Sequence, residues 1–166
     1  SQAEGNSAEC SSLFPLAHDR RNSYGESMLT AISKAIKASL YHVRALDLGS
    51  KRQYAPAIAW LRKEEEVLGF LPLKDRILLG ALHYASHNYL DAHAVLKNAY
   101  KDLGESKEFR SSHKVYLLAF VQDALHHCEL DAGTSLEHPM PDYSVVKLAA
   151  IPAYLKRNFP LRGHPD

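Results

Sequence analysis

The chain contains few cysteines, a single tryptophan and no long apolar run. Its two cysteines, Cys10 and Cys128, have neither CxxC spacing nor metal-spaced histidines beside them, which excludes a zinc finger. An exported chain could form one Cys10–Cys128 disulfide, whereas a reducing compartment would keep both as free thiols. No segment approaches the roughly 20 apolar residues that a transmembrane helix needs, so we expect no membrane span.

An excess of charge of one sign is also missing. Twenty lysines and arginines face 19 aspartates and glutamates, and the formal net charge is +1. This balance offers no bulk attraction for DNA, RNA or an anionic membrane, and we expect no nucleic-acid partner. No signal peptide is visible, and the chain begins at Ser1. That start slightly favours an exported or processed chain and otherwise leaves the location unknown.

Catalytic motifs are absent from the sequence. There is no GxSxG, P-loop or HExxH pattern, so we expect no enzyme and no catalytic residue. His127 and Cys128 are neighbours in sequence, but on a helix their side chains would point about 100° apart. Cys128 is therefore expected to be a small core residue rather than a nucleophile.

The ten histidines are the most unusual feature of the composition. His83 and His87 lie four residues apart on a predicted helix, a spacing that metal ligands use. No acidic third ligand accompanies them, and a buried ring at His83 is the more economical interpretation. We expect no metal and no cofactor. A helical protein that binds a metal or small ligand through histidines stays open as the alternative function.

Apolar periodicity predicts an all-α protein. From Met28 to Leu48 the apolar residues recur at gaps of three and four, which is one face of a helix. Nothing alternates with period two, so we predict no strand. Residues 1–22 are predicted to be a flexible arm, 23–158 a single helical domain and 159–166 a frayed tail. Helices are predicted within that domain at residues 23–48, 54–68, 73–86, 89–103, 107–130 and 142–158, where Pro152 ends the last one, kinks it or starts a new turn.

Two segments of the chain resemble each other. Residues 53–69 and 88–104 both read polar-Tyr-x-x-Ala-x-Ala-x-Leu and both end in Leu-Gly. Ala57 aligns with Ala92, and 92 − 57 gives a period of 35 residues. A repeat of about this length is typical of stacked helical hairpins.

Residues 73–106 carry the finer pattern of such a repeat. Leu79-Gly80, Tyr84, Ala92, Leu96 and Ala99 follow in order, and the unit resembles a tetratricopeptide repeat (TPR). The resemblance is fair over residues 38–72, where Glu64 replaces an expected Ala, and an unrelated helical bundle is the alternative. The TPR resemblance implies antiparallel helical hairpins of TPR-like solenoid type, with residues 107–130 as a long capping helix.

The resemblance implies a protein-interaction scaffold, an adaptor or chaperone-like module that holds an apolar peptide or helix of a partner in a concave groove. Some members of the family bind the C-terminal carboxylate of a partner at positions in this groove. The residues found there in this sequence do not form such a clamp, which favours an apolar partner. The chain's own residues 145–155 could fill the groove instead, and a homodimer would be another way to cover exposed core. The positions that correspond to the groove are His42, Leu46, Lys74, Ile77, Ala81, Tyr84, Ser111 and Val115.

Overall fold

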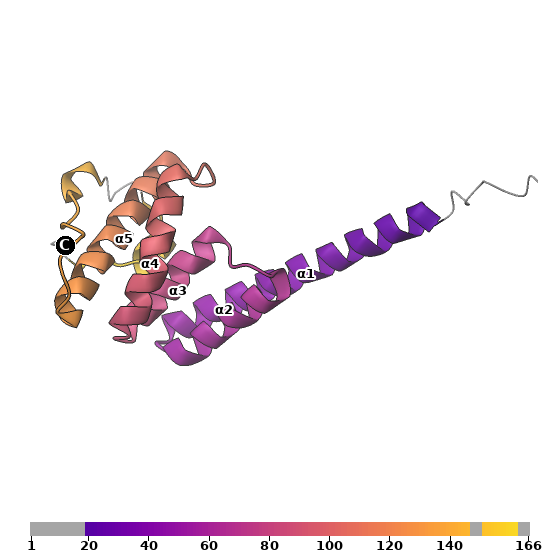
Figure 1. Cartoon of the computed structure of the whole chain (residues 1–166), viewed down its shortest axis with the longest axis horizontal. Coiled ribbons are helices and arrows are strands. Elements are labelled where there is room, and N and C mark those ends of the chain that lie inside the picture. Colours follow the sequence, from indigo (N-terminus) through magenta and orange to yellow (C-terminus); the bar gives the residue numbers. More distant parts are fainter. Residues whose placement is uncertain (1–18, 147–150, 163–166) are drawn as a thin grey trace, which may run out of the picture. The chain divides into compact units, whose positions relative to one another are not determined.

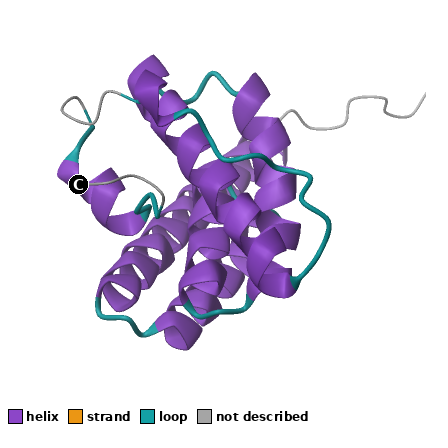
Figure 2. Ribbon diagram, turned by 90° about the vertical axis from the view of Figure 1, so that its left-hand side faces the viewer, coloured by secondary structure: helices purple, strands orange, loops and turns teal. Residues whose placement is uncertain are grey.

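A computed structural model describes residues 19–146 and 151–162, with side chains from residue 27 onward. The predicted all-α class is confirmed: within these ranges the chain forms helices and loops and no strand (Figures 1 and 2). None of the described helices is long and apolar enough to cross a membrane. The elements are α1 (Asp19–Ser50), α2 (Tyr54–Leu68), α3 (Leu73–Ala85), α4 (Tyr89–Glu105), α5 (Ser111–Ala132), the 3₁₀ turn η1 (Tyr143–Val145) and α6 (Ala153–Asn158).

The predicted helix boundaries agree best where a strong breaker follows. Helix α2 has the predicted bounds, and Gly69 closes it in the left-handed region at φ 79°. Helix α4 instead continues through Gly104, which lies inside the helix. Of the three options for Pro152, the structure has the new turn, because Pro152 stands directly before α6. Helix α1 begins at Asp19, so residues 19–22 of the predicted arm are helical, while residues 1–18 lie outside the described part.

Contacts divide the chain into two units, Ser1–Ser33 and Lys34–Asp166, and the division falls within α1. In the first unit, the described side chains Met28, Leu29 and Ile32 are all exposed. The second unit contains the hydrophobic core, which includes side chains from Ala45 in α1 to Phe159 beyond α6.

Helices α3, α4 and α5 lie side by side in this second unit (Figure 1). Three residues, 86–88, join α3 to α4, which forces the two helices to run antiparallel. A Cβ placed on Gly80 of α3 would lie 2.4 Å from Cδ2 of Leu96 in α4, far inside contact distance. Ala92 and Ala99 of α4 are fully buried. The small residues Gly80 and Ala92 therefore allow α3 and α4 to approach closely.

The C-terminal segment is packed, not frayed, as far as it is described. Phe159 is buried, and its ring lies 5.2 Å from that of Phe120 in α5. The backbone N–H of Arg162 donates to Asp123 over 2.8 Å. The structure therefore differs from the predicted frayed tail over residues 159–162, because one aromatic side chain and backbone hydrogen bonds hold these residues against α5.

Candidate binding site

Six of the eight predicted groove residues line two cavities in the second unit. His42, Leu46, Lys74 and Ile77 line a cavity of about 150 Å³. Ala81 and Tyr84, again with Leu46, line a larger one of about 480 Å³. Ser111 and Val115 line neither cavity; both are exposed on α5. The helical hairpins thus bring most of the predicted positions together on the α1, α3 and α5 side.

The chain's own C-terminal segment lies over this surface. Tyr154, Leu155, Asn158 and Phe159 line the smaller cavity together with the predicted residues, and Ile77 is completely buried. The predicted intramolecular occupant, residues 145–155, overlaps this segment only in part. Val145 is 61% exposed, whereas Leu155 is 5% exposed.

Polar contacts hold the segment in place. The Tyr116 hydroxyl donates to the main-chain oxygen of Phe159 over 2.7 Å. The guanidinium of Arg162 lies 5.1 Å from the ring centroid of Tyr84, within cation–π range. Burial raises the pKa of Tyr84, so this phenol is neutral at physiological pH. An apolar segment with polar anchors therefore already covers much of the predicted groove.

Helix α1 exposes a second apolar surface. Ala38, Ala45 and Leu48 face the core and are buried. Three large side chains on the opposite side of the same helix, Ile36, Leu40 and Val43, remain exposed by 58%, 62% and 62%. We call Ile36, Leu40 and Val43 the outer face of α1. A helix that is apolar on two opposite sides and covered on one has surface left for a partner.

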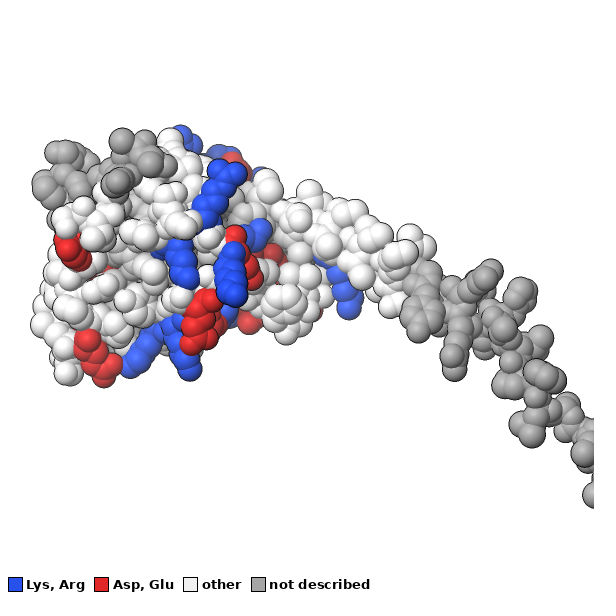
Figure 3. Space-filling view, turned by 90° about the horizontal axis from the view of Figure 1, so that it is seen from above, with Lys and Arg blue, Asp and Glu red and all other residues white. Residues whose placement is uncertain are grey.

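Basic residues flank the outer face. At 100° per residue, Lys37 and Arg44 both lie along one edge of it. Lys37 is exposed, and Arg44 makes a long contact of 3.4 Å with Asp47 at the surface. The side of the molecule drawn in Figure 3 shows Lys and Arg intermixed with Asp and Glu over the second unit and few charged side chains along the described part of α1.

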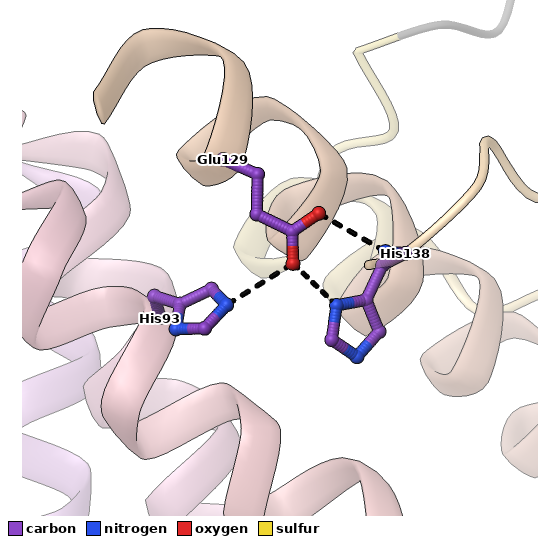
Figure 4. A group of neighbouring side chains, drawn as sticks. All are labelled: His93, Glu129 and His138. Atoms are coloured by element: carbon purple, nitrogen blue, oxygen red, sulfur yellow. Dashed lines mark hydrogen bonds and ion pairs between the residues drawn. The ribbon is translucent and has the colours of Figure 1, made fainter. Parts of the chain in front are cut away.

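Glu129 of α5 is the centre of a buried polar cluster (Figure 4). Its Oε1 atom accepts hydrogen bonds from His93 Nε2 over 3.1 Å and from His138 Nδ1 over 2.5 Å. Its Oε2 atom accepts from the backbone N–H groups of Glu137 and His138. Burial alone would raise the pKa of Glu129, but these bonds outweigh burial and bring it to about 2. The cluster ties the loop after α5 to α4 and leaves neither carboxylate oxygen unpaired.

A second buried cluster joins three helices. His42 of α1 contacts Asp75 of α3, and Glu64 of α2 completes the group. Glu64 is 2% exposed and Asp75 is 0% exposed. Burial, followed by the nearby charge of Asp75, raises the pKa of Glu64 to about 7. Sequence reasoning missed this pair, although Glu64 was visible as an acidic residue in place of an expected Ala.

His83, His87 and Cys128, which the sequence suggests as ligands or core residues, lie in different environments. His83 is buried as expected, and burial lowers its pKa; His87 lies exposed and contacts Tyr89 over 2.7 Å. Neither belongs to the two clusters above. Cys128 is a buried free thiol whose pKa burial raises to about 12, which fits a core residue. Its conceivable disulfide partner, Cys10, lies outside the described residues.

Comparison with protein-family models, with curated proteins and with solved structures finds no match for this chain. The resemblance to TPR units therefore rests on the order of residues in 73–106 of the sequence.

Proposed function

We propose that the chain is a protein-interaction module that binds an amphipathic helix of a partner protein along the outer face of α1. The observation that carries the proposal is the exposure of Ile36, Leu40 and Val43 on the side of α1 opposite the buried Ala38 and Ala45. Complete burial of such side chains contributes about 1.5–3 kcal/mol each, so a bound helix would gain substantially from covering them.

Charge defines the partner further. Lys37 and Arg44 border the outer face on one edge, and carboxylates placed along the corresponding edge of a bound helix would complement them. The favoured partner is therefore a helix with an apolar stripe and an acidic flank. A second copy of this chain would bring a basic edge and is the less favourable occupant.

The resemblance of residues 73–106 to a TPR unit supports an interaction role by analogy with stacked hairpins. Under this proposal the predicted groove is not the primary surface, because the C-terminal segment lines the same two cavities as Ile77 and Ala81. That segment provides an intramolecular example of an apolar peptide held by the hairpins. The alternative built on His83 and His87 gains nothing from the structure, since the two belong to no common cluster.

A synthetic helix of about three heptads tests the proposal. The probe has Leu at its core positions and Glu along its flanks, and a matched peptide has Lys in place of Glu. Fluorescence anisotropy should show saturable binding of the Glu peptide and at least tenfold weaker binding of the Lys peptide. The variant Leu40→Asp should no longer bind the Glu peptide.

The matched control is Leu90→Asp, because Leu90 is an equally exposed leucine, at 72%, on α4. Its binding should equal that of the wild-type chain. If Leu40→Asp binds the Glu peptide as tightly as the wild-type chain does, the proposal is overturned. Light scattering gives a second test. A dimer in the wild-type chain that Leu40→Asp dissociates would also overturn the proposal, since the outer face would then bind a second copy.

A further inference from the structure

His42, Glu64 and Asp75 bring one imidazole and two carboxylates together between α1, α2 and α3. One ligand-type atom from each residue lies within 4.8 Å of the others. The two carboxylates are almost inaccessible, while the His42 side chain is 21% exposed. The three residues thus form a buried acidic pair with a histidine on its solvent side.

One oxygen of each carboxylate lacks a hydrogen-bond donor. Oε2 of Glu64 and Oδ2 of Asp75 are both buried without a partner. His42 Nδ1 contacts the other oxygen of Asp75, and among the described residues no lysine or arginine forms an ion pair with either carboxylate. Two buried carboxylates with open acceptor positions are costly unless a cation or a proton joins them.

The other buried carboxylates of the described residues, Glu129 and Asp123, show a different pattern. Both oxygens of Glu129 accept hydrogen bonds. In Asp123, Oδ1 accepts from the Tyr143 hydroxyl over 2.6 Å and Oδ2 from the backbone of Arg162 over 2.8 Å. Among the described residues, therefore, the buried carboxylates outside this cluster are satisfied, and the open carboxylate positions are those of Glu64 and Asp75.

We propose that Glu64, Asp75 and His42 bind one divalent cation of the Zn²⁺ class. Two carboxylates and a dication sum to zero charge, which removes the main cost of burying the pair. One imidazole beside two carboxylates suits Zn²⁺, which accepts nitrogen and oxygen ligands in a four-coordinate shell. A water molecule would supply the fourth ligand from the solvent side.

Only small movements are required for binding. Zn–N and Zn–O bonds of about 2.0–2.2 Å place tetrahedral ligands about 3.4 Å apart, so no pair of ligand atoms has to approach by more than roughly 1.4 Å. The His42 ring would exchange its contact with Asp75 for the metal at Nδ1, with its proton carried on Nε2. His42 also lines the 150 Å³ cavity, so its side chain borders open space as well as the acidic pair.

Zinc titration of the full chain, stripped with a chelator, tests the proposal. Calorimetry should find one tight Zn²⁺ per chain and a rise in melting temperature, and Co²⁺ in place of Zn²⁺ should give visible d–d absorption. Glu64→Gln keeps the side-chain shape and removes one ligand charge. It should weaken the tight site by at least about 10–100-fold, the range found even for residues that only support ligands. Asp75→Asn should do the same.

The matched control is Glu129→Gln, which alters the other acid–histidine cluster of the fold. It should leave the affinity for Zn²⁺ unchanged. Three outcomes would overturn the proposal: no stoichiometric Zn²⁺ on the wild-type chain, unchanged affinity in Glu64→Gln, or an equal loss in Glu129→Gln. The wild-type titration decides the first of these by itself, whether or not a variant folds.

Discussion

Tyr116 in α5 donates its hydroxyl proton to the main-chain oxygen of Phe159, 43 residues further along the chain. The Tyr116 side chain is 2% exposed, and burial raises its pKa to about 12. A buried hydroxyl requires a partner, and the C-terminal segment supplies one. This bond, together with the contact of the Phe120 and Phe159 rings, makes Phe159 part of the core.

Removal of the hydroxyl should loosen the C-terminal segment. Tyr116→Phe keeps the ring but leaves the Phe159 carbonyl without its donor, so we expect a loss of about 1–3 kcal/mol in the free energy of unfolding. Urea denaturation followed by circular dichroism measures it. Tyr154→Phe is the control, because Tyr154 is 57% exposed and its change should have almost no effect. Equal stability of the two variants would contradict the structural role of the bond.

The contact of Gly80 with Leu96 gives a prediction of unusual sign. Alanine normally favours a helix over glycine by about 1 kcal/mol. At position 80 the added Cβ would lie 2.4 Å from Leu96, so Gly80→Ala should instead destabilise the chain by about 1–3 kcal/mol. Gly104→Ala in α4 is the matched control, since a Cβ there meets nothing within 4 Å. It should leave stability unchanged or raise it slightly in thermal unfolding.

A smaller residue at position 96 should relieve the clash. The double variant Gly80→Ala with Leu96→Ala is expected to be more stable than the sum of the two single losses predicts, because each change accommodates the other. Strict additivity would show that the two side chains do not compete for the same space.

The class of the fold and most helix boundaries were predictable from local patterns. Helix α2 has its predicted bounds, because Gly69 adopts a conformation that glycine favours and Pro72 follows. The C-terminal segment was not predictable in the same way. Phe159 follows Ile151 and Leu155 at gaps of four, but Pro152 and Pro160 interrupt this short pattern. Its burial depends on a distant partner in α5.

The candidate sites also differ in how far the sequence predicted them. The repeat pattern placed His42, Leu46 and Ile77 on one side of the hairpins, and the structure brings them to one cavity. The pairing of Glu64 with Asp75 depends instead on how α2 and α3 are rotated against each other. Glu64 was visible as a departure from the repeat, but no local signal in the sequence named its partner.

Glu129 should make the stability of the chain depend on acidity. Its pKa is about 2 in the folded chain and close to 4.5 when unfolded. A lowered folded pKa means that its contribution is complete above about pH 4.5 and is lost as the pH falls toward 2. We expect Glu129→Gln to cost about 1–3 kcal/mol at pH 7, because donors of His93 and His138 lose a charged acceptor.

The measurement is the urea midpoint of the wild-type chain and of Glu129→Gln between pH 7 and pH 2.5. The difference between them should shrink as the pH falls, since protonation removes the same charge from the wild type. Glu137→Gln serves as the control, because Glu137 pairs with Lys97 at the surface and its loss should leave the profile nearly unchanged. A constant difference between wild type and Glu129→Gln across this range would disprove the assignment.

The buried thiol of Cys128 should be inert in the folded chain. Burial raises its pKa to about 12, so almost no thiolate exists at neutral pH, and its side chain is 1% exposed. A Cys10→Ser variant leaves Cys128 as the only thiol. Iodoacetamide should then label native protein far more slowly than protein in urea, with mass spectrometry as the readout. Labelling at equal rates in both conditions would place Cys128 at an accessible surface and contradict its position in the core.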